Sequence, residues 1–361
     1  MKIALVGPAY PLRGGIAHHT YSLEKELTAR HHQVEVISYK KLYPRFLFPG
    51  RTTIDASELK LESGAQPTLD PLDPRTWFEA FRAIKKFSPR IVVVEWWNPF
   101  FAPALGALAA MLRMARIETI FECHNVFPHE RSLIDFPLLS FAFASVSRFI
   151  THSAKDREDL LSIKSAKVAV APLPPVEEFA GGARDRSGRR ILFFGIVRKY
   201  KGLDVLLRAM PRVLSEVECD LVVAGEFYDS VERYEAIIRE SGIEKNVRLE
   251  NRYIANEDVP ALFEEADVLV LPYLSATQSG VARIAIMNRL PIIASQTGGL
   301  SESVTEDCGL LVPPGNSDAL ADALIRYFKE GLGSVFSERM KRLDSASDDI
   351  ARVIEEMAEE N

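Results

Sequence analysis

Short runs rich in valine and isoleucine recur along this chain, and a stretch long enough for a helix separates most of them from the next. The runs lie at 2–7, 34–38, 91–95, 118–122, 149–151 and 168–171, and again at 190–195, 221–225, 247–250, 268–271, 292–294 and 310–312. Strands that alternate with helices form parallel sheets covered by helices on both faces. The sequence therefore predicts an α/β protein with two tandem, doubly wound, Rossmann-like domains.

The alternation is interrupted once, by a segment with prolines, paired glycines and mixed charges. Such composition is typical of a linker between domains. We predict a first domain over 1–175, a linker over 176–189, a second domain over 190–333 and a C-terminal helix over 334–361. The Pro-rich, weakly patterned stretch 43–73 predicts an irregular insertion. Doubly wound sheets bind ligands beyond the carboxyl ends of their strands, so two domains facing each other predict a site in an interdomain cleft.

Composition narrows the function. Of the 361 residues, 47% are hydrophobic and 26% are charged, as in folded globular proteins, and the net charge of −6 argues against nucleic acid as a partner. Three widely spaced cysteines favour neither a disulfide framework nor a metal site. The first strand begins directly after Met1 without a signal-peptide pattern. We therefore expect a cytoplasmic protein, which could also lie at the inner face of the membrane.

In the first half of the chain, two candidate functional features follow predicted strands. Gly14-Gly15 lie between the first strand and a helix, where backbone N–H groups can bind an anion, although tight turns also use glycine for steric reasons alone. His124 follows the strand that ends near residue 122. A histidine there can donate to a sugar hydroxyl or to developing charge, or it can merely cap neighbouring backbone.

The strongest motif is the basic turn Phe-Phe-Gly-Ile-Val-Arg-Lys-Tyr-Lys-Gly over 193–202. A strand ends in a glycine here, and a cluster of cations precedes the next helix. The guanidinium of Arg198 and the ammonium of Lys201 suit two adjacent phosphates, one bound in a bidentate manner and one by a point charge. A solvated basic turn is the alternative.

A second polar loop, Thr-Gln-Ser-Gly-Val over 277–281, joins another strand to a helix. The N–H groups of Ser279, Gly280 and Val281 would form a second phosphate cradle. Ordinary helix capping by Thr277 or Ser279 explains the same residues.

These motifs resemble the retaining glycosyltransferases of the two-Rossmann GT-B fold, family 4 (glycosyl transferases group 1). The resemblance covers most of the chain and is strongest over 190–314, where a subset of the family shares the Arg-Lys-Tyr-Lys-Gly turn and the Thr-Gln-Ser-Gly-Val loop. Further segments that carry it are Val-Ala-Gly-Glu at 223–226, Ala-Asp-Val-Leu-Val-Leu-Pro-Tyr at 266–273, Pro-Ile-Ile-Ala-Ser at 291–295 and Gly-Gly-Leu-Ser-Glu at 298–302.

The resemblance implies a hexosyltransferase that uses a nucleotide diphosphate sugar, transfers to a glycan or lipid-linked acceptor and needs no metal or other cofactor. The N-terminal domain would be the acceptor side, the C-terminal domain would bind the nucleotide sugar, and the last helix would pack back on the N-terminal domain. The implied roles are catalysis for His124, Arg198 and Lys201; diphosphate binding for Gly14, Gly15, Arg198, Lys201, Ser279, Gly280 and Val281; sugar binding for His124 and Gln278; and nucleobase binding for Tyr253 and Ile254.

The chain departs from many members of the family at three positions. Ile196 stands where an arginine follows the glycine, and Ala276 and Ile284 stand where two glutamates contact the donor sugar and ribose. The losses at 276 and 284 favour one alternative to a transferase, a non-catalytic GT-B scaffold or binding subunit of a glycan-assembly complex. A nucleotide-sugar epimerase, which shares the architecture, is a second alternative.

Peripheral membrane contact is a separate expectation. Apolar runs at 96–101 and 133–143 accompany the basic residues Lys40, Lys41, Arg45 and Arg51, a combination that favours anionic lipid surfaces. Buried core helices explain the apolar runs equally well. The sequence leaves the sugar, the base, the linkage and the oligomeric state open.

Overall fold

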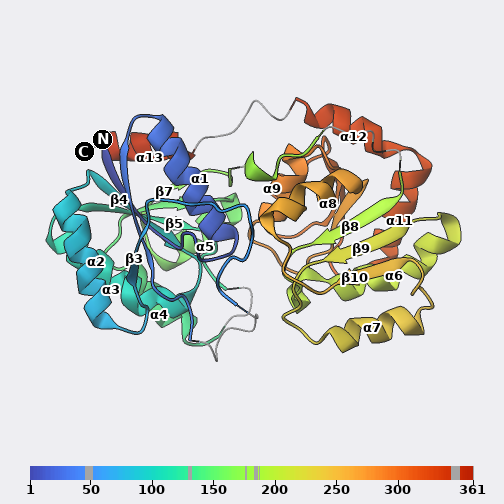
Figure 1. Cartoon of the computed structure of the whole chain (residues 1–361), viewed down its shortest axis with the longest axis horizontal. Helices are drawn as coiled ribbons and strands as arrows, with labels where there is room; N and C mark the ends of the chain where they lie inside the picture. Colours follow the sequence, from blue (N-terminus) through green and yellow to red (C-terminus); the bar gives the residue numbers. More distant parts are fainter. Residues whose placement is uncertain are drawn as a thin grey trace. The chain divides into compact units, whose positions relative to one another are not determined.

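The computed structural model describes residues 1–44, 52–128, 132–174, 177–182, 186, 188–342 and 350–360. The chain divides into two compact units, each a sheet flanked by helices (Figure 1). Unit 1 comprises Met1–Ala56, Lys60–Pro174 and Ser347–Asn361, and unit 2 comprises Ser57–Leu59 and Pro175–Ala346. Two parallel sheets with helices confirm the predicted α/β, two-domain fold.

Unit 1 contains a seven-stranded parallel sheet in the order β3-β2-β1-β4-β5-β6-β7. Its strands are β1 (Lys2–Val6), β2 (Gln33–Tyr39), β3 (Gln66–Leu69), β4 (Ile91–Trp96), β5 (Glu118–Cys123), β6 (Arg148–Thr151) and β7 (Lys167–Val170). The segment predicted to be an irregular insertion contributes the edge strand β3, so that prediction was wrong for these four residues. β3 contains Pro67, which an edge strand tolerates and which weakens the strand pattern.

Helices cover both faces of this sheet. They are α1 (Gly15–Ala29), α2 (Pro74–Phe87), α3 (Ala102–Met114), α4 (Asp135–Phe143), α5 (Ala154–Ile163) and α13 (Ile350–Glu359), with a 3-10 turn η1 (Pro99–Phe101). The last helix, α13, belongs to unit 1 and lies beside α1 (Figure 1). Its Ile350 and Ile354 share a buried cluster with Leu23 and Leu27 of α1.

Unit 2 contains a six-stranded parallel sheet in the order β10-β9-β8-β11-β12-β13. Its strands are β8 (Arg190–Phe194), β9 (Asp220–Ala224), β10 (Val247–Glu250), β11 (Val268–Leu271), β12 (Ile292–Ser295) and β13 (Gly309–Val312). The strand order reverses direction at β8 and β11, as it does at β1 and β4 in unit 1. Doubly wound sheets bind ligands at this switch point, beyond the carboxyl ends of the strands.

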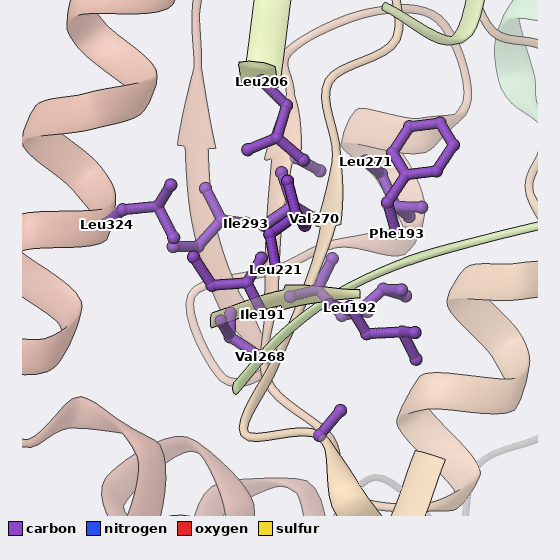
Figure 2. Close-up of a cluster of buried hydrophobic side chains, with 14 of the residues drawn as sticks. Ile191, Leu192, Phe193, Leu206, Leu221, Val268, Val270, Leu271, Ile293 and Leu324 are labelled. Carbon is purple, nitrogen blue, oxygen red and sulfur yellow. The ribbon is translucent and has the colours of Figure 1, made fainter. Parts of the chain in front are cut away.

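The core of unit 2 centres on β8 and its neighbours. Figure 2 shows Ile191, Leu192 and Phe193 of β8 among buried residues of the adjoining strands, with Leu206 and Leu324 contributed by helices. The helices of this unit are α6 (Leu203–Glu216), α7 (Val231–Glu240), α8 (Val259–Glu265), α9 (Gly280–Met287), α10 (Leu300–Ser303), α11 (Ser317–Lys329) and α12 (Leu332–Met340), and the 3-10 turns are η2 (Glu177–Phe179), η3 (Lys199–Lys201) and η4 (Asn256–Asp258).

Arg186 stabilises the ends of two of these helices from within the predicted linker. Its side chain is only 3% exposed and donates to the carbonyl oxygens of Phe263, Glu264 and Ala266 at the end of α8, at 3.0, 2.9 and 2.6 Å. It also donates to the carbonyl of Asn288 after α9, at 2.8 Å. Helix C-termini leave carbonyls without intrahelical partners, and one guanidinium satisfies several of them here.

Among the described residues, no helix is both long and apolar enough to cross a membrane. The apolar run at 99–112 forms η1 and most of α3, which is largely buried against β5 and α4.

Two glycines with the same left-handed backbone conformation provide a test of the packing in unit 2. Gly202 and Gly242 both have a left-handed conformation, with φ of 66° and 63°. A Cβ on Gly202 would overlap the carbonyl oxygen of Pro272, whereas a Cβ on Gly242 would meet nothing within 4 Å. We expect Gly242→Ala to cost about 1–2 kcal/mol from strain alone and Gly202→Ala to cost clearly more, measured by urea denaturation. Equal losses would contradict the close approach at Pro272.

Candidate functional site

The basic turn of unit 2 leaves the sheet at its centre, where β8 adjoins β11. Gly195 follows β8 with φ of 102°, and its N–H donates to the carbonyl of Ala224 at 2.9 Å. Val197 then pairs with the loop after β9, since its N–H donates to the carbonyl of Glu226 at 2.9 Å. The chain turns through η3 and enters α6 at the left-handed Gly202. The turn is therefore fixed by backbone hydrogen bonds on one side and by glycines at both ends.

Lys201 is the least solvated cation of this turn. The residue is 9% exposed, and its ammonium lies over the ring of Tyr273, 5.4 Å from the centroid. In the described part of the chain, no carboxylate pairs with it. Burial lowers the pKa of Lys201, with a further contribution from Arg198, although Tyr200 opposes the shift. A buried ammonium without a counterion is costly, and an anionic ligand would relieve that cost.

The same ammonium lies close to the polar loop that precedes α9. A Cβ placed on Gly195 would lie 3.2 Å from Nζ of Lys201 and 3.5 Å from a methyl group of Val281. The tertiary structure thus brings the two motifs together on either side of Gly195, as expected for the loops that follow neighbouring strands.

Arg198 is half-buried, and its guanidinium stacks over the ring of Tyr228 at 5.1 Å from the centroid. Tyr228 is held in turn by its N–H, which donates to the carbonyl of Val197 at 3.0 Å. Neither Tyr228 nor Tyr273 was predicted from the sequence to be part of the site. An aromatic residue shortly after each neighbouring strand was the available signal, because aromatic faces orient cations.

The loop before α9 caps this helix, as one of the two interpretations of its sequence predicted. Oγ of Ser279 accepts from the N–H of Ala282 at 3.2 Å. The N–H groups of Gly280 and Val281, at the first two positions of the helix, have no partner within an α-helix by geometry. Gln278 accepts a hydrogen bond from Ser303 of α10 at 3.0 Å. Capping by Ser279 leaves the two following amides able to meet an anion.

The two positions where the family has glutamates lie in different surroundings. Ile284 is 6% exposed and packs in the hydrophobic core of unit 2, whereas Ala276 lies in a loop at a point where Gly298 approaches its carbonyl closely. Tyr253 and Ile254 follow β10 at the same edge of the sheet, and the side chain of Ile254 is buried. At Ile254, therefore, only the backbone could contact a nucleobase.

In unit 1, Gly14 and Gly15 begin α1 at the carboxyl edge of the sheet. Gly14 has φ of 121°, which favours glycine, while Gly15 is the first helical residue. Both are exposed, and no side chain caps the helix. The first N–H groups of α1 therefore point outward from an uncapped N-terminus, where the helix dipole favours an anion.

His124 lies in a buried cluster of histidines and glutamates, which is the main feature that the sequence analysis missed. Its Nε2 lies 2.5 Å from Oε2 of Glu95, and the residue is 9% exposed. His19 of α1 contacts Glu122 at 2.6 Å and Glu95 at 3.8 Å. His152 after β6 lies 3.5 Å from Glu122. His124 thus does more than cap neighbouring backbone.

Register explains how two carboxylates come together. Glu95 and Glu122 are directly paired in the parallel ladder of β4 and β5, and both are fully buried. A charged residue inside each of two apolar strands was the signal in the sequence. Gly7 after β1 leaves room for one of them, because a Cβ there would lie 2.5 Å from Cγ of Glu95 and 2.8 Å from Oγ1 of Thr20.

The cluster separates the pKa values of its members. Burial and the neighbouring Glu122 raise the pKa of Glu95 well above its usual value, whereas burial lowers the pKa of His124 to about 3. Burial alone would lower the pKa of His19, but Glu122 and Glu95 outweigh it and raise that pKa to about 9. Burial opposes ionisation of Glu122, yet His19 holds its pKa below the usual range. These shifts favour an ion pair between His19 and Glu122 and oppose the ionisation of Glu95 and His124.

Comparison with known proteins assigns most of the chain. Residues 13–174 match Glycosyltransferase Family 4, and residues 188–330 match Glycosyl transferases group 1. The fold matches sucrose-phosphate synthase from Thermosynechococcus elongatus with a TM-score of 0.78 and 20% identity, over 99% of this chain and 98% of that one. The chain belongs to the GT-B glycosyltransferases.

Relatives of this glycosyltransferase include an uncharacterized glycosyltransferase of Methanocaldococcus jannaschii, 25% identical over 91% of this chain and 90% of that protein. A D-inositol 3-phosphate glycosyltransferase of Corynebacterium aurimucosum is 28% identical, and that match spans about half of each chain, 48% and 47%. The Anabaena protein HepE in complex with UDP-glucose has a TM-score of 0.75 at 15% identity, covering 99% and 98% of the two chains. The family and the enzyme class are thereby confirmed.

Gly7 and Gly15 form a matched pair that tests the cluster. We expect Gly7→Ala in this glycosyltransferase to displace Glu95 and to cost about 1–3 kcal/mol of unfolding free energy, as overpacking in a core does. Gly15→Ala, where a Cβ would meet nothing within 4 Å, should leave stability unchanged or slightly raised. Chemical denaturation of both variants measures the difference, and a Gly7→Ala variant as stable as the parent would contradict the tight contact.

Proposed function

We propose that this enzyme transfers a hexose from a nucleotide diphosphate sugar to a glycan or lipid-linked acceptor, with retention of anomeric configuration. Unit 2 binds the diphosphate of the donor. The observation that carries this proposal is Lys201, a 9% exposed ammonium with no carboxylate partner in the described residues, beside the N-terminus of α9. A buried cation is stable next to an anion, and the amides of Gly280 and Val281 add donors for phosphate oxygens.

Arg198 supplies the second positive charge of the diphosphate site. Its stacking on Tyr228 restricts the guanidinium, so it can bind phosphate with little further loss of side-chain freedom. Transfer releases the nucleoside diphosphate as an anion. Positive charge at Lys201 and Arg198 stabilises that leaving group, which is the contribution these two residues make to the rate.

His124 of unit 1 is proposed to contact the transferred sugar, and Gln278 is the candidate for sugar binding in unit 2. The contact of Nε2 with Glu95 orients the His124 ring, so its remaining exposed edge is presented in a fixed direction. Ser303 similarly restrains Gln278. The backbone at Tyr253 and Ile254 is proposed to meet the nucleobase. The apolar Ile284 cannot bind ribose hydroxyls, so the nucleoside is held by other groups than in members with a glutamate there.

UDP is the first nucleotide to test, because a protein of the same fold, Anabaena HepE, has been crystallised with UDP and with UDP-glucose. A thermal-shift series with UDP, GDP and ADP and their glucose conjugates compares donors directly. Ligand at 100 times its Kd adds about 2.7 kcal/mol of stability, which such a measurement resolves. Sugar release and transfer assays then follow with the nucleotide that binds.

Lys201→Met separates ligand binding from stability. Removal of a buried, unpaired charge should leave the melting temperature of the free protein unchanged or raise it, while the shift produced by the nucleoside diphosphate is lost. The matched control is Lys199→Met, an exposed lysine of the same turn, which should keep both values. If Lys201→Met retains the full ligand shift, the diphosphate does not bind at this turn.

Peripheral membrane contact is proposed for unit 1. Large apolar side chains are exposed at the start of α4: Leu133 is 99%, Ile134 65% and Phe136 56% exposed. By contrast Trp96 and Phe101 are fully buried, so the earlier apolar run is core. Of the basic residues, Lys40 pairs with Glu79 at 3.2 Å and Lys41 is exposed, while Arg45 and Arg51 lie outside the described residues.

We expect the double variant Leu133→Ser, Phe136→Ser to reduce cosedimentation with anionic liposomes, because the apolar contact with acyl chains is removed. Phe78→Ser is the control, since Phe78 is 50% exposed on α2, outside this patch. If all three proteins pelleted equally with the liposomes, or if the parent did not pellet, the proposed membrane contact would be rejected.

A further inference from the structure

The cluster around Glu95 and Glu122 has the composition of a metal site. His19, Glu95, Glu122 and His124 each offer one ligand atom, and all four atoms lie within 4.8 Å of one another. Three of these four are at most 6% exposed and the fourth, His124, is 9% exposed. Two imidazoles and two carboxylates are a common ligand set for first-row divalent ions.

The carboxylates are incompletely satisfied by the protein. Every ion pair that Glu95 and Glu122 make among the described residues is to a histidine, with no lysine or arginine involved. Oε2 of Glu122 is buried and has no hydrogen-bond partner, and neither has Oε1 of Glu95. Buried polar atoms almost always have a hydrogen-bond partner or bind another group, so these two oxygens indicate a missing ligand.

His152 adds a second indication. Its Nδ1 lies 2.8 Å from the carbonyl oxygen of Ala171 and must carry a hydrogen, because a carbonyl only accepts. The opposite atom, Nε2, points to Oε1 of Glu122 at 3.5 Å. In the neutral ring Nε2 then carries no hydrogen and cannot donate to Glu122, so His152 does not satisfy this buried carboxylate.

From this geometry we propose that unit 1 binds one divalent transition-metal ion, with Zn²⁺ as the reference ion, through His19, Glu95, Glu122 and His124. Zinc takes nitrogen and carboxylate oxygen at about 2.0–2.2 Å, which places ligand atoms roughly 3–4 Å apart. The present separations are 2.5, 2.6 and 3.8 Å for three pairs and at most 4.8 Å for any pair, so the two short contacts would have to lengthen and the longest ones to shorten when an ion binds.

The ion would add a shared ligand to three elements that side-chain contacts already bring together: α1 through His19, β4 through Glu95, and β5 with its following loop through Glu122 and His124. It would also hold His124 through Nε2 and leave the hydrogen on Nδ1, which fixes a donor on the opposite side of the ring. The role is thus to position His124 and to stabilise unit 1. It differs from the diphosphate chemistry of unit 2.

The test uses the full chain, treated with dipicolinate, dialysed and equilibrated with one equivalent of Zn²⁺. We expect one zinc per chain by elemental analysis and a rise in melting temperature, and Co²⁺ in place of Zn²⁺ should give visible absorption without a thiolate band. Glu122→Gln and His19→Asn should weaken zinc binding at least ~10-fold. His32→Asn is the control, because His32 contacts Glu355 at the same 2.6 Å separation but outside the cluster.

Three results would overturn the proposal. The parent protein could fail to retain stoichiometric zinc, which would mean that the cluster is a self-contained network of protons and ion pairs. Glu122→Gln and His19→Asn could bind zinc like the parent. A cobalt–thiolate band could instead point to Cys123, which ends β5 beside the cluster. The zinc titration of the parent protein tests the proposal even if the variants fail to fold. None of these results alters the nucleotide test on unit 2.

Discussion

Glu95 and Glu122 stand side by side in register near the ends of β4 and β5, and both are buried among apolar neighbours. Burial of one carboxylate costs several kcal/mol unless it is paired, and burial of two neighbours adds their repulsion. The surroundings follow from that constraint. Three histidines from different elements face the pair, and Gly7 omits a side chain where Glu95 needs space. The switch point of unit 1 is organised around buried negative charge.

Unit 2 has the opposite arrangement at the equivalent place in its sheet. Lys201 presents a buried positive charge without a carboxylate partner in the part of the chain described, and Arg198 lies nearby on an aromatic ring. Glycines at both ends of the turn and the backbone bonds to the loop after β9 hold these cations in place. A folded protein keeps an uncompensated buried charge at a cost in stability. The proposed binding of an anionic ligand would offset this cost.

The two switch points therefore carry different chemistry on the same topology. The fold alone cannot distinguish them, since both sheets reverse strand order in the same way. The local residues differ: glycine and cations follow β8, whereas glutamates lie just before the ends of β4 and β5. This agrees with the general rule that a fold positions a site while the local residues determine its chemistry.

The sequence by itself determined the architecture. Every strand expected from the valine and isoleucine runs is present, because the central strands of a sheet covered on both faces are mostly apolar. It also located the basic turn and the loop before α9, since glycines and cations at strand ends leave a local signature. It missed β3, whose proline and short length weaken the pattern, and it missed the partners of His124. Glu95, His19 and His152 are far from His124 in the sequence, and only the parallel register and the packing of α1 bring them together. Local patterns specify elements, whereas the meeting of charges from separate elements depends on the tertiary fold.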